Sequence, residues 1–273
     1  LINSLMDCLL DFFDIIVEEV IDMLIDTHCH LSKEDYDNID EVIDNNKKAL
    51  VNKIVVSGCS KESIKEVMVL KDKYDMVYVT LGFHPEYADI ITVNDLNYLR
   101  NLLKEKKVVG IGEIGLDYHY TKENKDKQLW LFEEQLKIAY DYNLPVVIHS
   151  RDATMDTINI LKKYKVRGII HCFSGSLETA NIYIGMGFLL GIGGVVTFKN
   201  SKLKDVVKNI SLNNIVLETD SPYLTPEPFR GKVNSSKYLV YIAKFIADLK
   251  NISVEEIEKI TSNNASCLFD FNK

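Results

Sequence analysis

The chain has 273 residues, of which 47% are hydrophobic and 26% charged, with 13 glycines and 5 prolines. These proportions are ordinary for a globular enzyme and exclude a low-complexity or disordered protein. The formal net charge is −8, and residues 1–22 hold 6 acidic residues with no lysine or arginine. The rest is close to neutral, which disfavours a broad basic face for tight binding of duplex DNA but permits local recognition of phosphate.

The five cysteines are odd in number, far apart and form no C-x-x-C pair. This spacing argues against a disulfide framework and against a zinc finger, and it favours a reducing, cytoplasmic setting. No apolar run approaches the roughly 20 residues that a membrane-spanning helix needs. A basic segment followed by an apolar core is also missing at the amino terminus. We therefore expect neither export nor a membrane partner.

Residues 1–22 are predicted to form an amphipathic, acidic helix, because their apolar residues recur at helical spacing and their acidic residues lie opposite. Such a helix could cover the floor of the following domain, precede a natural start at Met23, or dock a partner or second subunit. The first two interpretations are favoured. Anionic lipid would repel the acidic face. We treat 1–22 as an N-terminal extension and 23–273 as a single domain.

From Met23 onward, short β-branched runs alternate with segments of helical periodicity. Eight runs of strand character lie at 23–27, 53–57, 77–82, 108–112, 145–149, 168–171, 188–191 and 215–219. Helical spacing is found at 34–50, 61–74, 94–106, 124–142, 153–164, 177–186, 200–209, 235–249 and 253–260.

This alternation predicts an α/β fold, a TIM (β/α)8 barrel. Val146-Val-Ile148 and Gly168-Ile-Ile170 are apolar throughout, as strands covered on both faces require. A doubly wound open sheet is the alternative, but Gly191-Ile-Gly-Gly194 follows a strand without opening a G-x-G-x-x-G helix. In a parallel barrel, every strand points its last side chains toward one rim.

Six potential metal ligands follow these predicted strands at the rim. His28 and His30 are two positions apart and should project together from the first strand. Nitrogen and oxygen donors without thiolate suit Zn²⁺, Mn²⁺, Co²⁺, Fe²⁺ or, less well, Mg²⁺. A set this large predicts two divalent ions. One is assigned to His28, His30 and Asp220, the other to His149 and His171, with Glu113 bridging them.

Two adjacent divalent ions suit hydrolysis, because they generate a nucleophile near neutral pH and clamp both oxygens of a phosphoryl centre. Asp220 could also accept the proton of an attacking water, so Asp220 and Glu113 are the predicted catalytic residues. The alternatives are a turn at Asp220-Ser-Pro222 and a loop cap at Glu113. The glycines around Glu113 are expected to leave room for an ion.

Basic and aromatic side chains near the same rim are candidates for substrate binding. Arginine's planar fork matches phosphate oxygens, although Arg151 could instead pair with carboxylates of the metal site. Tyr118 and Phe173 could stack on a nucleotide, and His119 is expected on a surface loop. The predicted substrate-binding residues are His84, Arg151, Arg230 and Lys232.

Together these motifs resemble the TatD family of metal-dependent hydrolases, within the amidohydrolase-like barrels. The resemblance runs from about Met23 to the carboxyl end. It rests on Asp26-Thr-His-Cys-His-Leu31, Gly82-Phe-His-Pro85, Gly112-Glu-Ile-Gly-Leu-Asp-Tyr118, His149-Ser-Arg-Asp-Ala153, His171-Cys-Phe-Ser-Gly175, and Glu218-Thr-Asp-Ser-Pro-Tyr-Leu224 followed by Arg230-Gly-Lys232. It implies a TIM-type barrel, a dinuclear metal site with the six ligands above, and hydrolysis of DNA phosphodiesters, often from the 3′ end.

The sequence departs from the family pattern after Arg230-Gly-Lys232, where Val233-Asn-Ser-Ser236 stands in place of the usual Asn-Glu-Pro. Contacts from that loop are therefore not implied. Residues 1–22 have no counterpart in the pattern.

The leading hypothesis is a divalent-metal-dependent deoxyribonuclease, a 3′–5′ exonuclease on single-stranded DNA. It would use two divalent ions such as Mg²⁺, Mn²⁺ or Zn²⁺ and have no obligate protein partner. A D-aminoacyl-tRNA deacylase or another ester hydrolase is the alternative. A non-enzymatic scaffold is disfavoured, because buried imidazoles and carboxylates without a metal would be costly.

Overall fold

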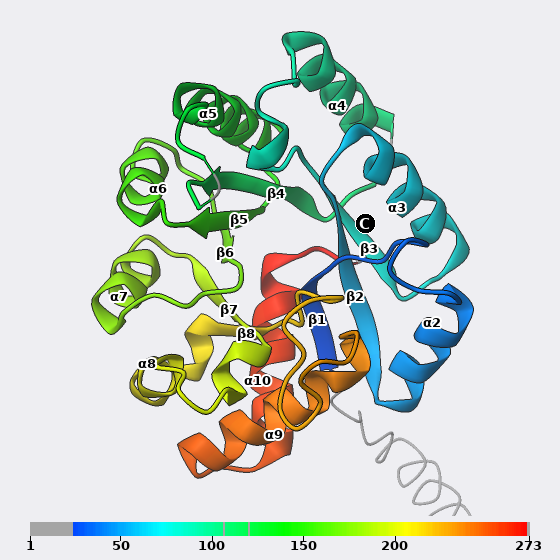
Figure 1. Cartoon of the computed structure of the whole chain (residues 1–273), viewed down its shortest axis with the longest axis vertical. Helices are drawn as coiled ribbons and strands as arrows, with labels where there is room; N and C mark the ends of the chain where they lie inside the picture. Colours follow the sequence, from blue (N-terminus) through cyan, green and yellow to red (C-terminus); the bar gives the residue numbers. More distant parts are fainter. Residues whose placement is uncertain (1–23, 106, 120, 272–273) are drawn as a thin grey trace, which may run out of the picture.

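The computed structural model describes residues 24–105, 107–119 and 121–271. In this part of the chain, eight parallel strands follow one another around a nearly closed barrel in sequence order (Figure 1). They are β1 (Leu24–Cys29), β2 (Val51–Gly58), β3 (Val77–Leu81), β4 (Gly110–Asp117), β5 (Val146–Arg151), β6 (Gly168–Ile170), β7 (Leu189–Ile192) and β8 (Ile215–Leu217). The predicted TIM barrel is confirmed. The predicted helix at 1–22 lies outside the described residues.

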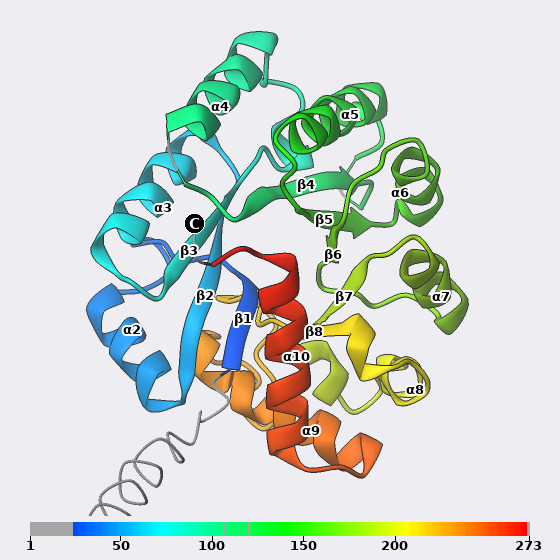
Figure 2. The same ribbon diagram turned by 180° about the vertical axis from the view of Figure 1, so that it is seen from behind.

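Helices surround the barrel and cover the outer face of its strands (Figures 1 and 2). They are α2 (Ile39–Lys48), α3 (Lys61–Lys73), α4 (Val93–Glu105), α5 (Lys125–Asp141), α6 (Thr154–Leu161), α7 (Leu177–Gly185), α8 (Leu203–Asn209), α9 (Leu239–Lys250) and α10 (Val254–Leu268). No helix among the described residues combines the length and apolarity needed to cross a membrane.

Two helix boundaries differ from the sequence prediction for identifiable reasons. Helix α2 begins at Ile39 rather than at 34, because the side chain of Asn38 caps it by accepting the N–H of Glu41. Helix α10 continues to Leu268 rather than ending at 260. Its last turn carries Ala265 and Leu268, which are buried against the barrel interior.

One end of the barrel is closed by this last helix. Ala265, Leu268 and Phe269 pack with one apolar residue from each of five strands, Ile25, Val55, Val147, Ile169 and Val216, and with Val109, which directly precedes β4. Figure 2 shows α10 crossing in front of the strands on this side. Because this end is filled with apolar side chains, the polar residues of the interior gather at the opposite end of the strands.

Two strands are irregular where they approach that polar end. Asp26 of β1 pairs with Ile54 of β2, and Cys29 pairs with Val56, so β1 has one more residue than β2 between these two pairs. A similar shift lies between Ile111 and Ile114 of β4. Such bulges change the direction in which the following side chains point. They lie at His28 and at Glu113, so they help to aim both residues.

Candidate metal centre

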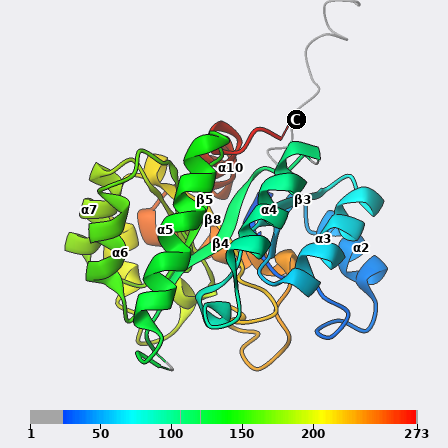
Figure 3. The ribbon, with the colours of Figure 1, turned by 90° about the horizontal axis from the view of Figure 1, so that it is seen from above.

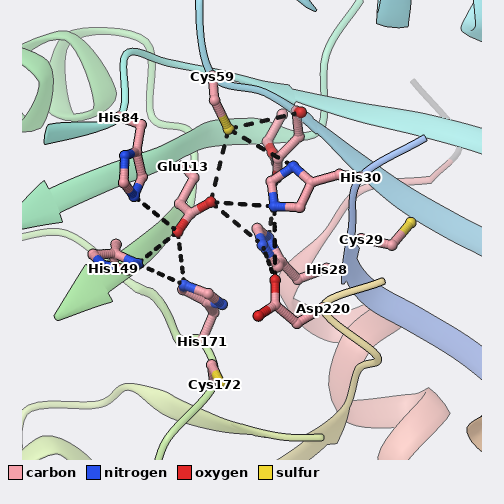
Figure 4. Close-up of polar contacts among 12 residues, drawn as sticks. His28, Cys29, His30, Cys59, His84, Glu113, His149, His171, Cys172 and Asp220 are labelled. Carbon is pink, nitrogen blue, oxygen red and sulfur yellow. Dashed lines mark hydrogen bonds and ion pairs between the residues drawn. The ribbon is translucent and has the colours of Figure 1, made fainter. Parts of the chain in front are cut away.

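Glu113 lies at the centre of a cluster formed by the six predicted ligands (Figure 4). Its Oε2 is 3.5 Å from Nε2 of His28 and 3.5 Å from Nε2 of His30. Its Oε1 is 2.8 Å from Nδ1 of His149 and 2.7 Å from Nε2 of His171. One carboxylate therefore presents a different oxygen to each pair of histidines.

Asp220 completes the first pair. Its Oδ1 lies 3.6 Å from Nε2 of His28 and 3.7 Å from Nε2 of His30. Backbone hydrogen bonds fix this position, because the N–H of Asp220 donates to the carbonyl of His28 and the N–H of His30 donates to that of Ser221. The segment after β8 is thereby bonded to the end of β1. The structure thus brings all six predicted ligands together.

The cluster is buried on one side and open on the other. The side chains of His28, Glu113 and His171 are at most 4% exposed, whereas those of His30, His149 and Asp220 are 15–24% exposed. Nε2 of His28 is buried and has no hydrogen-bond partner among the described residues. An unpaired buried nitrogen is costly unless something binds it, and a cation among nitrogen and oxygen donors would do so.

An outer side chain lies near the second ring nitrogen of each of these histidines. Nδ1 of His28 is 3.1 Å from the hydroxyl of Ser57, and Nδ1 of His30 is 4.0 Å from the thiol of Cys59. Nε2 of His149 is 3.1 Å from Asp117, whereas Nδ1 of His171 is 3.8 Å from Glu218 and has no hydrogen-bond partner among the described residues. Such outer contacts orient metal-binding imidazoles. All four rings therefore turn their remaining nitrogen toward Glu113.

Sequence reasoning did not identify three of these outer residues, Ser57, Asp117 and Glu218. Strand alternation was the available signal, because Asp117 lies four positions after Glu113 and Glu218 two positions before Asp220. Glu218 also explains a glycine. A Cβ at Gly191 would lie 2.1 Å from Oε2 of Glu218, so this position must stay small.

A fifth histidine near the cluster, His84, is arranged differently. Its Nδ1 accepts the N–H of Glu86, so in the neutral ring the proton is on Nε2. That Nε2 is 3.7 Å from Oε1 of Glu113. Burial lowers the pKa of His84 to about 4, which keeps the ring neutral near pH 7. His84 therefore presents an N–H donor to the centre, as a substrate-binding residue would.

The pKa values favour charged carboxylates in the cluster. Burial acts to raise the pKa of Glu113, but the charges of His171, His84 and His28 outweigh it and hold that pKa well below its usual range. Burial likewise opposes the hydrogen bonds from His28 and His30, which lower the pKa of Asp220. Both carboxylates are therefore ionised near pH 7, which is the state that binds a cation.

The histidines differ in protonation within the first pair as well as between the pairs. Burial acts to lower the pKa of His30, but its hydrogen bonds with Asp220 and Cys59 prevail and hold that pKa well above its usual range. Burial, followed by the charge of His171, lowers the pKa of His28 to about 4. Burial also acts to lower the pKa of His149, but its hydrogen bonds with Asp117 and Glu113 prevail and raise it to about 9. Without a cation, His149 therefore carries a proton near pH 7. A metal ion bound there must displace that proton.

Two details of the sequence analysis need correction. His28, Glu113 and His149 do not follow their strands but lie within β1, β4 and β5, which continue to Cys29, Asp117 and Arg151. The glycines beside Glu113 make room for β5 rather than for an ion. A Cβ at Gly112 would lie 2.7 Å from that of Val147, and one at Gly115 only 2.0 Å from the carbonyl oxygen of His149.

The two aromatic residues that the sequence suggested for stacking on a nucleotide are not accessible. Tyr118 and Phe173 are buried, and the hydroxyl of Tyr118 donates to Asp156, so neither ring is open to a nucleotide. Tyr223 is the exposed ring near the centre. It is 60% exposed, and its centroid lies 6.4 Å from that of His30. His119 lies on the surface as expected, 3.0 Å from Asp152.

The three predicted basic residues are all exposed but make different contacts. Arg151 is the last residue of β5. Burial acts to raise the pKa of Asp117, but hydrogen bonds from His149 and His119 and the charges of His149 and Arg151 lower it. Arg230 stacks on Phe198, with its guanidinium carbon 3.7 Å from the ring centroid, and Lys232 lies over Phe229. These two contacts involve the loops after β7 and β8 and no residue of the cluster.

Comparison with known proteins identifies relatives along nearly the whole chain. The model of a family described as TatD related DNase matches residues 25–270. The metal-dependent hydrolase YabD of Bacillus subtilis is 47% identical over 92% of this chain and 100% of its own length. The metal-dependent hydrolase YcfH of Escherichia coli K12 is 36% identical over 90% of this chain and 95% of its own.

Solved structures give the same result. The TatD homologue YjjV of Escherichia coli K12 superposes with a TM-score of 0.86 at 32% identity, covering 92% of this chain and 99% of that one. A TatD family hydrolase from Entamoeba histolytica superposes with a TM-score of 0.81 at 23% identity, which shows the shared fold. With a matching family model and full-length relatives, the chain belongs to the family of TatD related DNases.

Proposed function

We propose that this protein is a divalent-metal-dependent deoxyribonuclease that hydrolyses phosphodiester bonds at the 3′ ends of single-stranded DNA. The observation that carries the proposal is the position of Glu113, whose two oxygens face two separate pairs of histidines. The description of the family as DNases and the naming of its relatives as metal-dependent hydrolases support the reaction class.

The donor set fits two divalent ions. His28, His30 and Asp220 would hold one, His149 and His171 the other, and Glu113 would contribute an oxygen to each. The set contains imidazoles and carboxylates, which suit Zn²⁺, Mn²⁺ and related ions. Bound ions would supply Lewis acidity toward the phosphoryl group and lower the pKa of a water molecule.

Side chains of the protein would carry out proton transfer and substrate binding. Asp220 is ionised and 15% exposed at the open side of the cluster, so it can accept the proton of the attacking water. His84 can donate its Nε2 proton in a hydrogen bond to a phosphate oxygen. Arg151 at the end of β5, and Arg230 and Lys232 on the loop after β8, would supply positive charge for the phosphates of the strand.

The test is hydrolysis of a 5′-labelled single-stranded oligonucleotide with Mg²⁺, Mn²⁺ or Zn²⁺, compared with EDTA. We expect metal-dependent shortening from the 3′ end, and a circular single strand should resist. Glu113→Gln should abolish the reaction. The matched control is Glu123→Gln, which removes an exposed carboxylate outside the cluster and should retain activity.

The proposal fails if the metal-loaded protein does not shorten the oligonucleotide, or if Glu113→Gln shortens it as wild type does. D-aminoacyl-tRNA is assayed in parallel. Faster metal-dependent release of the amino acid than of nucleotides would assign the centre to carboxylic esters instead.

A further inference from the structure

The segment from Phe198 to Lys250 differs in charge from the rest of the chain. It contains nine lysines and arginines against five aspartates and glutamates, although the whole chain has a net charge of −8. Two of the five acids, Glu218 and Asp220, belong to the metal centre and its surroundings. The exposed part of this segment is therefore basic on an otherwise acidic protein, which is complementary to a polyanion.

Aromatic rings lie among these basic groups. Phe229 stacks on Tyr238 with centroids 4.6 Å apart, and Tyr241 contacts the edge of Phe229 at 4.7 Å. Lys232 lies over Phe229 at 5.5 Å and Lys237 over Tyr238 at 5.1 Å. We call this group the aromatic–basic surface. With Arg230 on Phe198, it comprises Phe198, Phe229, Arg230, Lys232, Lys237, Tyr238 and Tyr241.

This surface is accessible to a partner. Arg230 and Lys232 are exposed, and Tyr241 is 40% exposed although it is aromatic. The loop between β8 and α9, gold to orange in Figure 3, projects from the side of the molecule opposite the labelled carboxyl terminus. The surface therefore faces solvent on the side of the barrel opposite the end that α10 closes.

The same loop connects the surface with the metal centre. It starts at Asp220, whose carbonyl accepts the N–H of Tyr223, and continues through Phe229 to Lys232. Asn234 braces it from within, because its buried side chain donates to the carbonyls of Thr219 and Tyr223. A strand bound at the metal centre would meet Tyr223 first and this loop next.

We propose that the aromatic–basic surface binds single-stranded DNA upstream of the bond to be cleaved, stacking its bases on the rings and pairing its phosphates with the cations. Rings interleaved with cations are the usual means of binding single strands without sequence preference. In a duplex the base faces are already stacked on one another, so the rings favour single strands. The inference rests on the deoxyribonuclease function proposed above and extends it to a second region.

The experiment measures binding in EDTA, where hydrolysis does not interfere. The probe is a fluorescent oligothymidylate of about 15 nucleotides, within the range that such surfaces cover. We expect Tyr241→Ala to raise the Kd about tenfold, as the loss of one base stack does. Tyr241→Phe keeps the ring and should bind as wild type. Tyr140→Ala, which removes an even more exposed tyrosine from α5, is the matched control and should also bind as wild type.

Salt dependence tests the cations separately. Lys237→Gln should reduce the slope of log Kd against log salt concentration by about 0.7, the effect of one phosphate contact on a single strand. An unchanged slope together with unchanged binding by Tyr241→Ala overturns the inference. Equally tight binding of a duplex of the same length, with the same loss in Tyr241→Ala, also overturns it, because stacking would then play no part.

These results are distinguishable from a failure of the proposed function. If wild type shortens DNA but Tyr241→Ala and Lys237→Gln bind it unchanged, the nuclease function stands and the surface is wrong. If wild type binds the oligothymidylate through Tyr241 but shortens it with none of the metals, the surface stands and the hydrolytic assignment is wrong.

Discussion

The two halves of the candidate centre differ in how far their carboxylates lie from the expected position of the ion. In the half built from β1 and β8, Asp220 faces the histidines directly, and the outer partners are the neutral Ser57 and Cys59. In the half built from β5 and β6, only Glu113 faces the histidines, and the outer partners are the carboxylates Asp117 and Glu218.

The pKa values of the histidines follow burial and direct hydrogen bonds. Burial lowers the pKa of His28 to about 4, whereas hydrogen bonds with carboxylates outweigh burial at His30, whose pKa lies well above its usual range, and at His149, whose pKa is about 9. An outer carboxylate makes an imidazole a stronger ligand. The negative charge beside Glu113 therefore comes from the direct ligand Asp220 in one half and from Asp117 behind His149 in the other, because burial raises the pKa of Glu218 well above its usual range.

The largest loss of activity is expected from a change at Glu113, which contacts both halves of the centre. Glu113→Gln removes the carboxylate that faces both pairs, so both ions should be lost and hydrolysis should fall by about 10³-fold or more. Oligonucleotide hydrolysis at saturating metal measures this. A variant that loses only one ion and keeps measurable hydrolysis would show that the halves are independent.

The outer partners test the comparison directly. Asp117→Asn should weaken metal binding in the β5–β6 half by about 10–100-fold, because it neutralises the charge behind His149. Ser57→Ala removes a neutral contact behind His28 and should weaken the other half less. A two-site metal titration of both variants measures the difference. Equal losses, or a larger loss in Ser57→Ala, would remove the distinction between the halves.

His84 is expected to contact the substrate and not to bind a metal ion. His84→Gln should lower kcat/KM by about 10–100-fold through loss of one hydrogen bond to a charged phosphate, while metal content stays at the wild-type level. His149→Gln is the comparison and should lose metal. If His84→Gln also lost an ion, His84 would be a seventh ligand and the division into two halves would need revision.

The smallest expected effect is on the stability of the metal-free protein. His28 and His84 have folded pKa values of about 4, below the ordinary 6.5, so protonation opposes folding and stability should rise from pH 4 to 6.5. His149, with a pKa of about 9, and His30, with a pKa well above its usual range, have raised values, so their stabilising contributions are present below pH 6.5 and are lost as pH rises through the folded pKa values.

Thermal unfolding in EDTA should therefore show a maximum Tm near pH 6.5, with a change of several degrees on each side, at about 2–4 °C per kcal/mol. His149→Gln should reduce the change on the alkaline side, where His30 also contributes, and should leave the acidic side as in wild type. A wild-type Tm that increases from pH 6.5 to 9 would contradict the assigned protonation of the β5–β6 half.

Strand counting and the position of ligands after apolar runs were sufficient to predict the barrel and the six residues that converge on its rim. The bulges in β1 and β4 could not be predicted, because pairing register depends on the neighbouring strand rather than on local sequence. For the same reason Glu113 was expected after its strand instead of within it.

The outer partners and the aromatic–basic surface were missed for another reason. Ser57 and Asp117 contact histidines 29 and 32 positions away, so only the closed barrel brings them together. Asn234 stands where the loop departs from the family pattern, and its role as a brace depends on buried carbonyls that sequence does not reveal. Tyr118 and Phe173 were expected to be open, but packing of the barrel covers them.

The most direct test of the account is the metal content per chain, measured by elemental analysis in wild type and in Glu113→Ala. Two halves that share Glu113 predict two divalent ions in wild type and a fall toward zero in the variant. One ion or none in wild type, or two ions retained in Glu113→Ala, would contradict the shared carboxylate on which the proposed centre depends.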